Sequence, residues 1–200
     1  MKIVVIGATG TIGKAVADAL AKRHNVARVG NKRGGYQVDL ASPDSIKRLL
    51  RTIAPFDAVV CAAGLAKFGP LKELTDADFL LGLSNKLMGQ VNLVRMGLSH
   101  MTDRGSFTLT SGVLSQEPMP GSAAISPVNA GIEGFVRAAA LEMPRGVRIN
   151  AVSPPWVKET MEAMGMDSSS GMPAATVAKA YVESVEGTKN GVVIDARTFG

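Results

Sequence analysis

Three glycines near the start of the chain, Gly7, Gly10 and Gly13, are spaced three residues apart. They follow residues 2–6, a β-branched apolar run typical of a strand, and precede residues 12–20, whose apolar members recur at helical spacing. A glycine turn at this place lets the backbone approach a phosphate closely. The helix start adds free N–H groups and the positive end of the helix dipole. The segment therefore predicts a binding site for the phosphates of a nucleotide.

The spacing differs from the usual G-x-G-x-x-G dinucleotide pattern. An ordinary strand-to-helix turn of an α/β protein is the alternative. The flanking strand and helix favour the nucleotide site.

The composition is that of a globular protein with one α/β domain. The chain has 200 residues, 46% of them hydrophobic and 20% charged, and a net charge of +5. Its basic residues are spread along the chain and aromatic residues are few, so we expect no nucleic-acid partner. The positive charge is either a solvated surface or a mild attraction for an anionic cofactor.

Cys61 is the only cysteine, which excludes an intrachain disulfide, and its apolar surroundings predict a buried core residue. The first apolar run is too short for a signal peptide, because Lys14 and Asp18 interrupt the apolar residues after it. No run is long enough to cross a bilayer. We expect a cytoplasmic protein without a membrane partner or a metal site.

Strand and helix patterns alternate to the end of the chain. The further strands are expected at residues 26–29, 36–40, 58–62, 106–110, 147–152 and 191–194, and the further helices at 43–53, 83–101, 126–142 and 173–185. Such alternation predicts a Rossmann-like, doubly wound parallel sheet of about seven strands with helices on both faces, as one domain over residues 1–200. Residues 161–172 are poor in structure signals and form either a lid or a plain loop.

Several segments together resemble the short-chain dehydrogenase/reductase family. Residues 7–13 resemble its cofactor loop in a variant spacing, and residues 61–64 resemble its Asn-Asn-Ala-Gly. Residues 105–111 resemble the strand that delivers the catalytic serine, and residues 129–142 with 147–154 resemble its last catalytic helix and the following strand. The resemblance implies cofactor contacts at Gly7, Thr9, Gly10, Thr11, Ile12, Gly13, Leu40, Ala62, Ala63, Gly64, Thr110, Pro154 and Val157.

The segment after the second strand bears on cofactor choice. Enzymes that prefer NAD place an acid there to bind the ribose 2′-hydroxyl. This chain has no acid there but Asn31, Lys32 and Arg33, whose two cations suit a 2′-phosphate. NADP(H) is therefore favoured over NAD(H), with solvated loop charges as the alternative. Asp39 is either an adenine contact, as the family implies, or a helix-entry residue.

The family's catalytic residues are only partly present. The resemblance aligns its Tyr-x-x-x-Lys motif with residues 125–129, so Ile125 replaces Tyr and Asn129 replaces Lys. The serine position holds Ser111. The family's helical Asn aligns with Lys86, or with Asn85 if the helix register differs. Asn129 can still bond a ribose hydroxyl but supplies no positive charge.

Of the substituted positions, Lys86 is the one whose side chain can take part in catalysis. Near the nicotinamide, and partly desolvated, it would have a lowered pKa and act as proton donor while Ser111 orients the carbonyl. The favoured alternative is an exposed helix lysine or a ligand for a phosphate or carboxylate.

The residues support two functional hypotheses. The first is an NADP(H)-dependent oxidoreductase that acts on a small carbonyl or alcohol by hydride transfer. The second is a non-catalytic NADP(H)-binding sensor or regulatory module, favoured by the missing Tyr and Lys. The family resemblance also implies a homodimer or homotetramer packed through residues 87–98 and 135–141, which are otherwise ordinary core.

Overall fold

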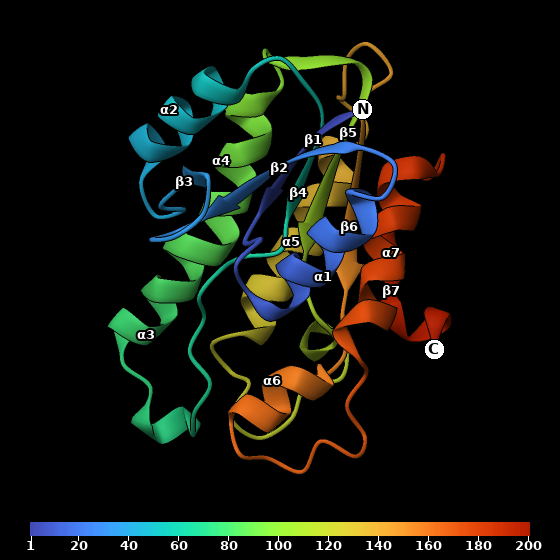
Figure 1. Ribbon diagram of the computed structural model, residues 1–200. Helices are drawn as coiled ribbons and strands as arrows, with labels where there is room; N and C mark the ends of the chain where they lie inside the picture. Colours follow the sequence, from blue (N-terminus) through green and yellow to red (C-terminus); the bar gives the residue numbers. More distant parts are fainter.

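A computed structural model describes all 200 residues as alternating strands and helices (Figure 1). The strands are β1 (Lys2–Ile6), β2 (Asn25–Gly30), β3 (Tyr36–Gln37), β4 (Phe56–Cys61), β5 (Met101–Thr110), β6 (Arg148–Ser153) and β7 (Val193–Asp195). The α-helices are α1 (Thr11–Leu20), α2 (Pro43–Ile53), α3 (Asp76–Leu81), α4 (Met88–Gly97), α5 (Ser126–Ala139), α6 (Lys158–Ala163) and α7 (Ala174–Glu186). The shorter elements are the π-helix η2 (Gly82–Leu87) and the 3-10 turns η1 (Leu71–Glu73), η3 (Val113–Ser115) and η4 (Ala196–Phe199).

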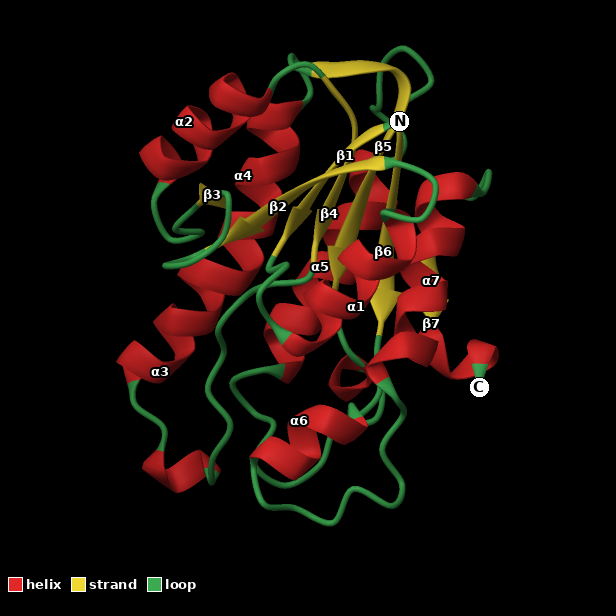
Figure 2. Ribbon diagram, viewed as in Figure 1, coloured by secondary structure: helices red, strands yellow, loops and turns green.

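All seven strands are parallel and form one sheet in the order β3-β2-β1-β4-β5-β6-β7 (Figure 2). The predicted doubly wound sheet is therefore confirmed. The direction in which the chain adds strands reverses beside β1, with β2 on one side and β4 on the other. In open parallel sheets, ligands bind beyond the carboxyl ends of the strands at such a reversal. The segments that follow β1, β2 and β4 meet at this place.

Helices cover both faces of the sheet. Helices α1 and α7 pack together over one face, and α2, α4 and α5 cover the other. Within β1, Val4 and Ile6 join the core under α2, α4 and α5, whereas Ile3 and Val5 join the core under α1 and α7. This burial on both faces explains why the strand is a continuous apolar run.

The predicted helix over residues 83–101 was wrong in three respects. Its first part is the π-helix η2, α4 ends at Gly97, and Met101 already belongs to β5. The apolar spacing continues through both helical segments, so it does not reveal that the turn is widened. Such single π-helical turns are frequent at functional sites, and η2 buries Asn85 beside Lys86.

Three other boundaries also differ from the prediction. Only Tyr36–Gln37 of the expected strand 36–40 pairs with β2, and Asp39 turns toward α2 instead. Helix α5 ends at Ala139 rather than near residue 142. Helix α6 enters the segment 161–172, and a single bridge joins Val157 to Met172 across it.

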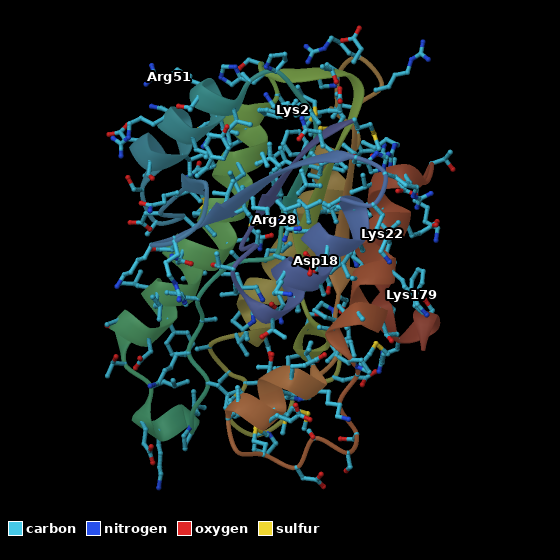
Figure 3. The ribbon with its side chains drawn as sticks, in the orientation of Figure 1. Lys2, Asp18, Lys22, Arg28, Arg51 and Lys179 are labelled. Carbon is cyan, nitrogen blue, oxygen red and sulfur yellow. The ribbon has the colours of Figure 1, made fainter.

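Surface charges on α1 are paired with neighbours. Asp18 lies 2.7 Å from Arg28 of β2 and 3.1 Å from Lys14 (Figure 3). The two cations hold the pKa of the Asp18 carboxyl below its usual value. No helix is long and apolar enough to span a membrane.

Candidate functional site

The glycine turn after β1 is tightly folded. Gly7 has a φ of +84°, and its N–H and that of Ala8 both donate to the carbonyl of Val29 at 2.9 and 3.0 Å. A side chain on Gly7 would lie 2.5 Å from the carbonyl oxygen of Ala62, and one on Gly13 would overlap the Gly7 carbonyl. These contacts hold the start of α1 directly against the turn. The backbone of Gly10, the N-cap of α1, stays exposed.

A cavity of about 540 Å³ opens beside this turn at the carboxyl ends of β1, β2 and β4. It brings together ten predicted cofactor-binding residues: Gly7, Thr9, Gly10, Asn31, Lys32, Arg33, Leu40, Ala62, Ala63 and Gly64. Sequence reasoning assigned no cofactor contact to its other residues, Ile6, Gly30, Val38, Leu65 and Asn85. Asn85 fixes one rim of the cavity, because its Oδ1 accepts from the N–H of Leu65 at 2.8 Å.

The cationic part of the cavity is the exposed turn after β2. Asn31, Lys32 and Arg33 all line the cavity, and no acidic residue does. Gly30 permits this turn, because a side chain there would overlap the carbonyl of Arg33. The turn thus offers positive charge to an anionic group in the cavity.

Other predicted cofactor residues lie outside this cavity. Asp39 is exposed and its carboxylate accepts from the N–H of Ala41 at 2.9 Å, which favours the turn role over an adenine contact. Thr11 lines a separate groove between α1 and α7. Thr110 is buried under α7, where its hydroxyl donates to the Cys61 carbonyl at 2.6 Å and accepts from Tyr181 at 2.7 Å.

A second, smaller cavity of about 200 Å³ lies next to the first. It brings together all three predicted catalytic residues, Lys86, Ser111 and Asn129, and three predicted cofactor contacts, Ile12, Pro154 and Val157. Asn85 and Lys86 are consecutive, yet one lines the large cavity and the other the small one. The π-helix η2 therefore contributes a lining residue to each cavity.

Lys86 is buried, with 8% of its surface exposed, so the alternative of an exposed helix lysine was wrong. Its Nζ donates to Asn129 Oδ1 at 2.6 Å and to the Ser111 carbonyl at 2.9 Å. Asn129 Nδ2 donates in turn to the Gly112 carbonyl at 3.3 Å, which fixes the orientation of the amide. Burial lowers the pKa of Lys86 to about 8.

Two glycines make room for the Lys86–Asn129 pair. Gly64 has a φ of +149°, and a side chain there would lie 2.5 Å from Lys86 Cγ. Gly112 has a φ of +154°, and a side chain there would lie 2.9 Å from Asn129 Nδ2. Both backbone conformations are unfavourable for other residues.

The hydroxyl of Ser111 is engaged with the backbone. Its Oγ donates to the Val152 carbonyl at 3.3 Å, a long bond that leaves the oxygen free to accept. Ile125, at the position that the resemblance assigns to tyrosine, lines the same cavity as Ser111 and Lys86. Lys86 is thus the only ionisable side chain that lines the small cavity.

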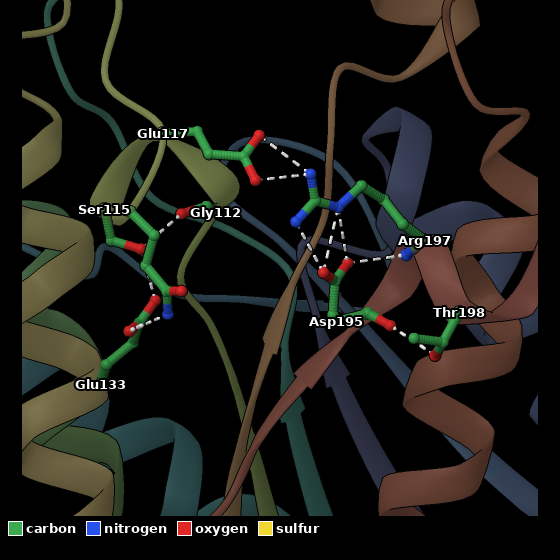
Figure 4. Close-up of polar contacts among 8 residues, drawn as sticks. Gly112, Ser115, Glu117, Glu133, Asp195, Arg197 and Thr198 are labelled. Atoms are coloured by element: carbon green, nitrogen blue, oxygen red, sulfur yellow. Dashed lines mark hydrogen bonds and ion pairs between the residues drawn. The ribbon is translucent and has the colours of Figure 1, made fainter.

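Hydrogen bonds and ion pairs fix the position of residues 111–117, which follow β5 (Figure 4). Ser115 donates to the buried Glu133 of α5 at 2.6 Å. Arg197, near the carboxyl end of the chain, donates to Glu117 at 2.8 Å and to Asp195 at 2.8 Å. These contacts hold in place the segment that contributes Gly112, Val113 and Leu114 to the small cavity.

Sequence reasoning missed Trp156, which lines the small cavity. It is the only tryptophan of the chain and follows Pro154 and Pro155 at the end of β6. Its place after a strand end, where ligands bind in parallel sheets, was the available signal.

Comparison with known proteins gives a family for the whole chain. The family model described as enoyl-(acyl carrier protein) reductase matches residues 3–192. The hydroxynaphthalene reductase arp2 of Aspergillus fumigatus is 30% identical over 159 residues, which are 74% of this chain and 58% of that protein. The chain thus spans less than two thirds of that relative's length.

Solved structures give the same result. The protein lin1944 from Listeria innocua is 40% identical with a TM-score of 0.94, and the match covers 98% of both chains. A small-chain dehydrogenase solved in complex with NADPH is 26% identical with a TM-score of 0.87, covering 98% of this chain and 95% of that one. The chain therefore belongs to the short-chain dehydrogenase/reductase family.

Proposed function

We propose that the protein is an NADP(H)-dependent oxidoreductase that reduces a small carbonyl compound, or oxidises the matching alcohol, with Lys86 in the place of the usual tyrosine. The observation that carries the proposal is the position of Lys86. It is the only ionisable side chain that lines the small cavity, which adjoins a larger cavity fit for a dinucleotide.

The residues that line the larger cavity support NADP(H) as the cofactor. Glycines at the turn after β1 allow close approach of a pyrophosphate to the start of α1. Lys32 and Arg33 would hold a 2′-phosphate, and no carboxylate lines the cavity to repel it. The similar dehydrogenase solved with NADPH supports the same choice over NAD(H).

The chemistry would take place at the small cavity. NADP(H) held by the residues of the larger cavity would supply a hydride to the carbonyl carbon of a substrate in the small cavity. Protonated Lys86 donates a proton to the carbonyl oxygen and regains one from water. The Ser111 hydroxyl would leave its long bond to the Val152 carbonyl and donate a second hydrogen bond to that oxygen. Asn129 and the Ser111 carbonyl position the amine. A pKa of about 8 leaves Lys86 mostly protonated at neutral pH and still able to release its proton.

The test is consumption of NADPH with a panel of ketones, aldehydes and quinones. We expect turnover by the native protein, at least a 100-fold loss in Lys86→Met, and no change in Lys179→Met, which removes an exposed lysine from α7. Native turnover that persists in Lys86→Met would exclude Lys86 as the proton donor.

A second candidate is a non-catalytic NADP(H) sensor or regulatory module. It is favoured by Ile125, which has no proton to give, and by the Ser111 hydroxyl that donates to the backbone. Tight NADPH binding without turnover of any carbonyl compound in the panel would favour this candidate.

We also propose a homo-oligomer formed through α4 and α5. Leu93, Val94 and Val136 on these helices belong to the core, but Met88 of α4 and Leu141, just after α5, are exposed. Light scattering that gives the mass of a single chain would contradict this proposal.

A further inference from the structure

The small cavity holds a positive charge that nothing in the protein balances. The partners of the Lys86 ammonium are two uncharged oxygens, Asn129 Oδ1 and the Ser111 carbonyl. An ammonium has three N–H donors, so one remains for a ligand. No Asp or Glu lines the cavity. A buried cation without a counterion is unfavourable, and an anion that enters the cavity would relieve this.

One other titratable group faces Lys86. Cys61 lies at the end of β4, with its thiol directed to the Ala63 carbonyl at 3.5 Å. Burial raises the pKa of this thiol to about 12, so it is uncharged at neutral pH and cannot serve as the counterion. The groups on η2, β5 and α5 that contact Lys86 carry no charge.

The rest of the cavity is mostly apolar, with Ser111, Asn129 and Thr160 as its other polar residues, and it is small. Its walls include Ile12, Leu114, Ile125, Pro154, Trp156 and Val157. Its volume of about 200 Å³ is below the roughly 300–1,000 Å³ of clefts that take drug-sized ligands. A ligand with one or two rings fits this volume.

An aromatic pair adds to this apolar wall. Trp156 contacts Phe68 edge-to-face, with ring centroids 6.0 Å apart and an angle of 82° between the rings. Gly121 packs directly against Phe68, because a side chain at Gly121 would lie 2.8 Å from the Phe68 ring. Trp156 lines the cavity and Phe68 is 40% exposed, so the pair extends from the cavity to the surface. Such a wall favours a flat apolar ring.

From these observations we propose that the small cavity selects a compact apolar ring with a single acidic oxygen (a phenol, an enol or an aromatic carboxylic acid), bound as its anion against Lys86. This deepens the proposed function and rests on the same site, since the oxygen of such a ligand occupies the place of the carbonyl oxygen. It narrows the substrate to ring ketones whose enol or phenol form is acidic; the anion binds Lys86, and only the keto form accepts hydride while protonated Lys86 donates to its oxygen.

Trp156 makes the test direct, because it is the only tryptophan of the chain and lines the cavity. Its fluorescence is followed while benzoate, benzyl alcohol or benzylamine is added. We expect saturable binding of benzoate, at least tenfold tighter than that of benzyl alcohol, and no binding of benzylamine. Benzoate stays ionised above about pH 6. Its affinity therefore falls by up to about thirtyfold between about pH 7 and pH 9.5, as Lys86 loses its proton.

Lys86→Met removes the charge at similar length and should lose the preference for benzoate over benzyl alcohol. Lys179→Met removes one exposed charge from α7, and this variant should retain the preference for benzoate. Equal affinity for benzoate and benzyl alcohol in the native protein overturns the proposal, as does a benzoate affinity independent of pH. The pH series needs no variant, so it decides even if Lys86→Met fails to fold.

NADPH fluorescence in the same samples separates the two proposals. NADPH binding without any preference for benzoate overturns this inference and leaves the proposed function intact. Benzoate binding without NADPH binding overturns the proposed function and leaves this inference intact.

Discussion

Lys86 Nζ donates to Asn129 Oδ1 at 2.6 Å, so the lysine of η2 and the amide of α5 form one unit inside the small cavity. An uncharged partner at this distance keeps the lysine oriented without adding a negative charge that would raise its pKa. The resemblance to the family suggests a lost lysine at position 129. The structure instead shows a lysine that reaches the same cavity from a different helix.

Asn129→Asp tests this relationship. A carboxylate beside Lys86 favours the ammonium, so the pKa of Lys86 should rise from about 8 by roughly 1–3 units. Nitrogen NMR of the lysine amine measures this directly. The alkaline limb of any turnover profile should move upward by a similar amount. An unchanged pKa would mean that the two side chains do not contact each other in solution.

The stability of the protein should also depend on Lys86 at alkaline pH. Its folded pKa of about 8 is below its ordinary value of 10.5, so between these values the unfolded chain holds a proton that the folded chain has released. The Lys86 contribution to the free energy of unfolding is therefore constant below about pH 8 and becomes more favourable as the pH rises. Relative to Lys86→Met, native protein should gain about 1–2 kcal/mol between about pH 8 and pH 9.5.

Urea unfolding of both proteins at these two pH values measures the gain. A stability difference between the two proteins that does not change with pH would show that the lysine has an ordinary pKa, and one that shifts in favour of Lys86→Met at the higher pH would show a raised pKa.

Gly64→Ala should destabilise the protein by about 2–3 kcal/mol, because the new methyl group would overlap Lys86 in an unfavourable backbone conformation. Gly134→Ala is the matched control. Gly134 lies exposed in α5 with no atom near the position of a side chain, so alanine there should stabilise by about 0.5–1 kcal/mol. Thermal unfolding compares the two variants. Similar effects at both positions would contradict the close packing of Gly64 on Lys86.

Much of the fold could be predicted because each strand has its own apolar signal. The run over residues 2–6 predicted β1, and the glycines after it predicted the turn at the larger cavity. The strand at Tyr36 was shorter than predicted, because an edge strand pairs on one side only and Asp39 caps a turn instead.

The site was harder to predict, because it depends on a turn that apolar periodicity does not reveal. The spacing of Leu87, Val91, Val94 and Leu98 is that of a regular helix, yet the turn before it is a π-helix that points Lys86 inward. The burial of Lys86 depends on contacts with Gly64 and Asn129, which are 22 and 43 residues away in the sequence. Nothing local to Lys86 indicates either contact.

Cofactor preference should depend on the turn after β2. Replacing Lys32 and Arg33 together by alanine removes two cations from the larger cavity, so NADPH affinity should fall at least tenfold. NADH affinity should change less than twofold, because NADH lacks the 2′-phosphate. Arg51→Ala, at the exposed end of α2, is the control. Fluorescence titration measures all three proteins, and an equal loss for both cofactors would contradict the role of this turn.

The most direct measurement follows hydride from the cofactor to a product. NADPH deuterated at the transferred position is incubated with the native protein and a panel of aromatic ring ketones, and the alcohols are examined by mass spectrometry. We expect deuterium on the carbinol carbon with native protein and with Lys179→Met, and transfer at least 100-fold slower with Lys86→Met. Deuterium transfer at the native rate in Lys86→Met, or NADPH binding with no transfer to any ketone by native protein, would contradict this expectation.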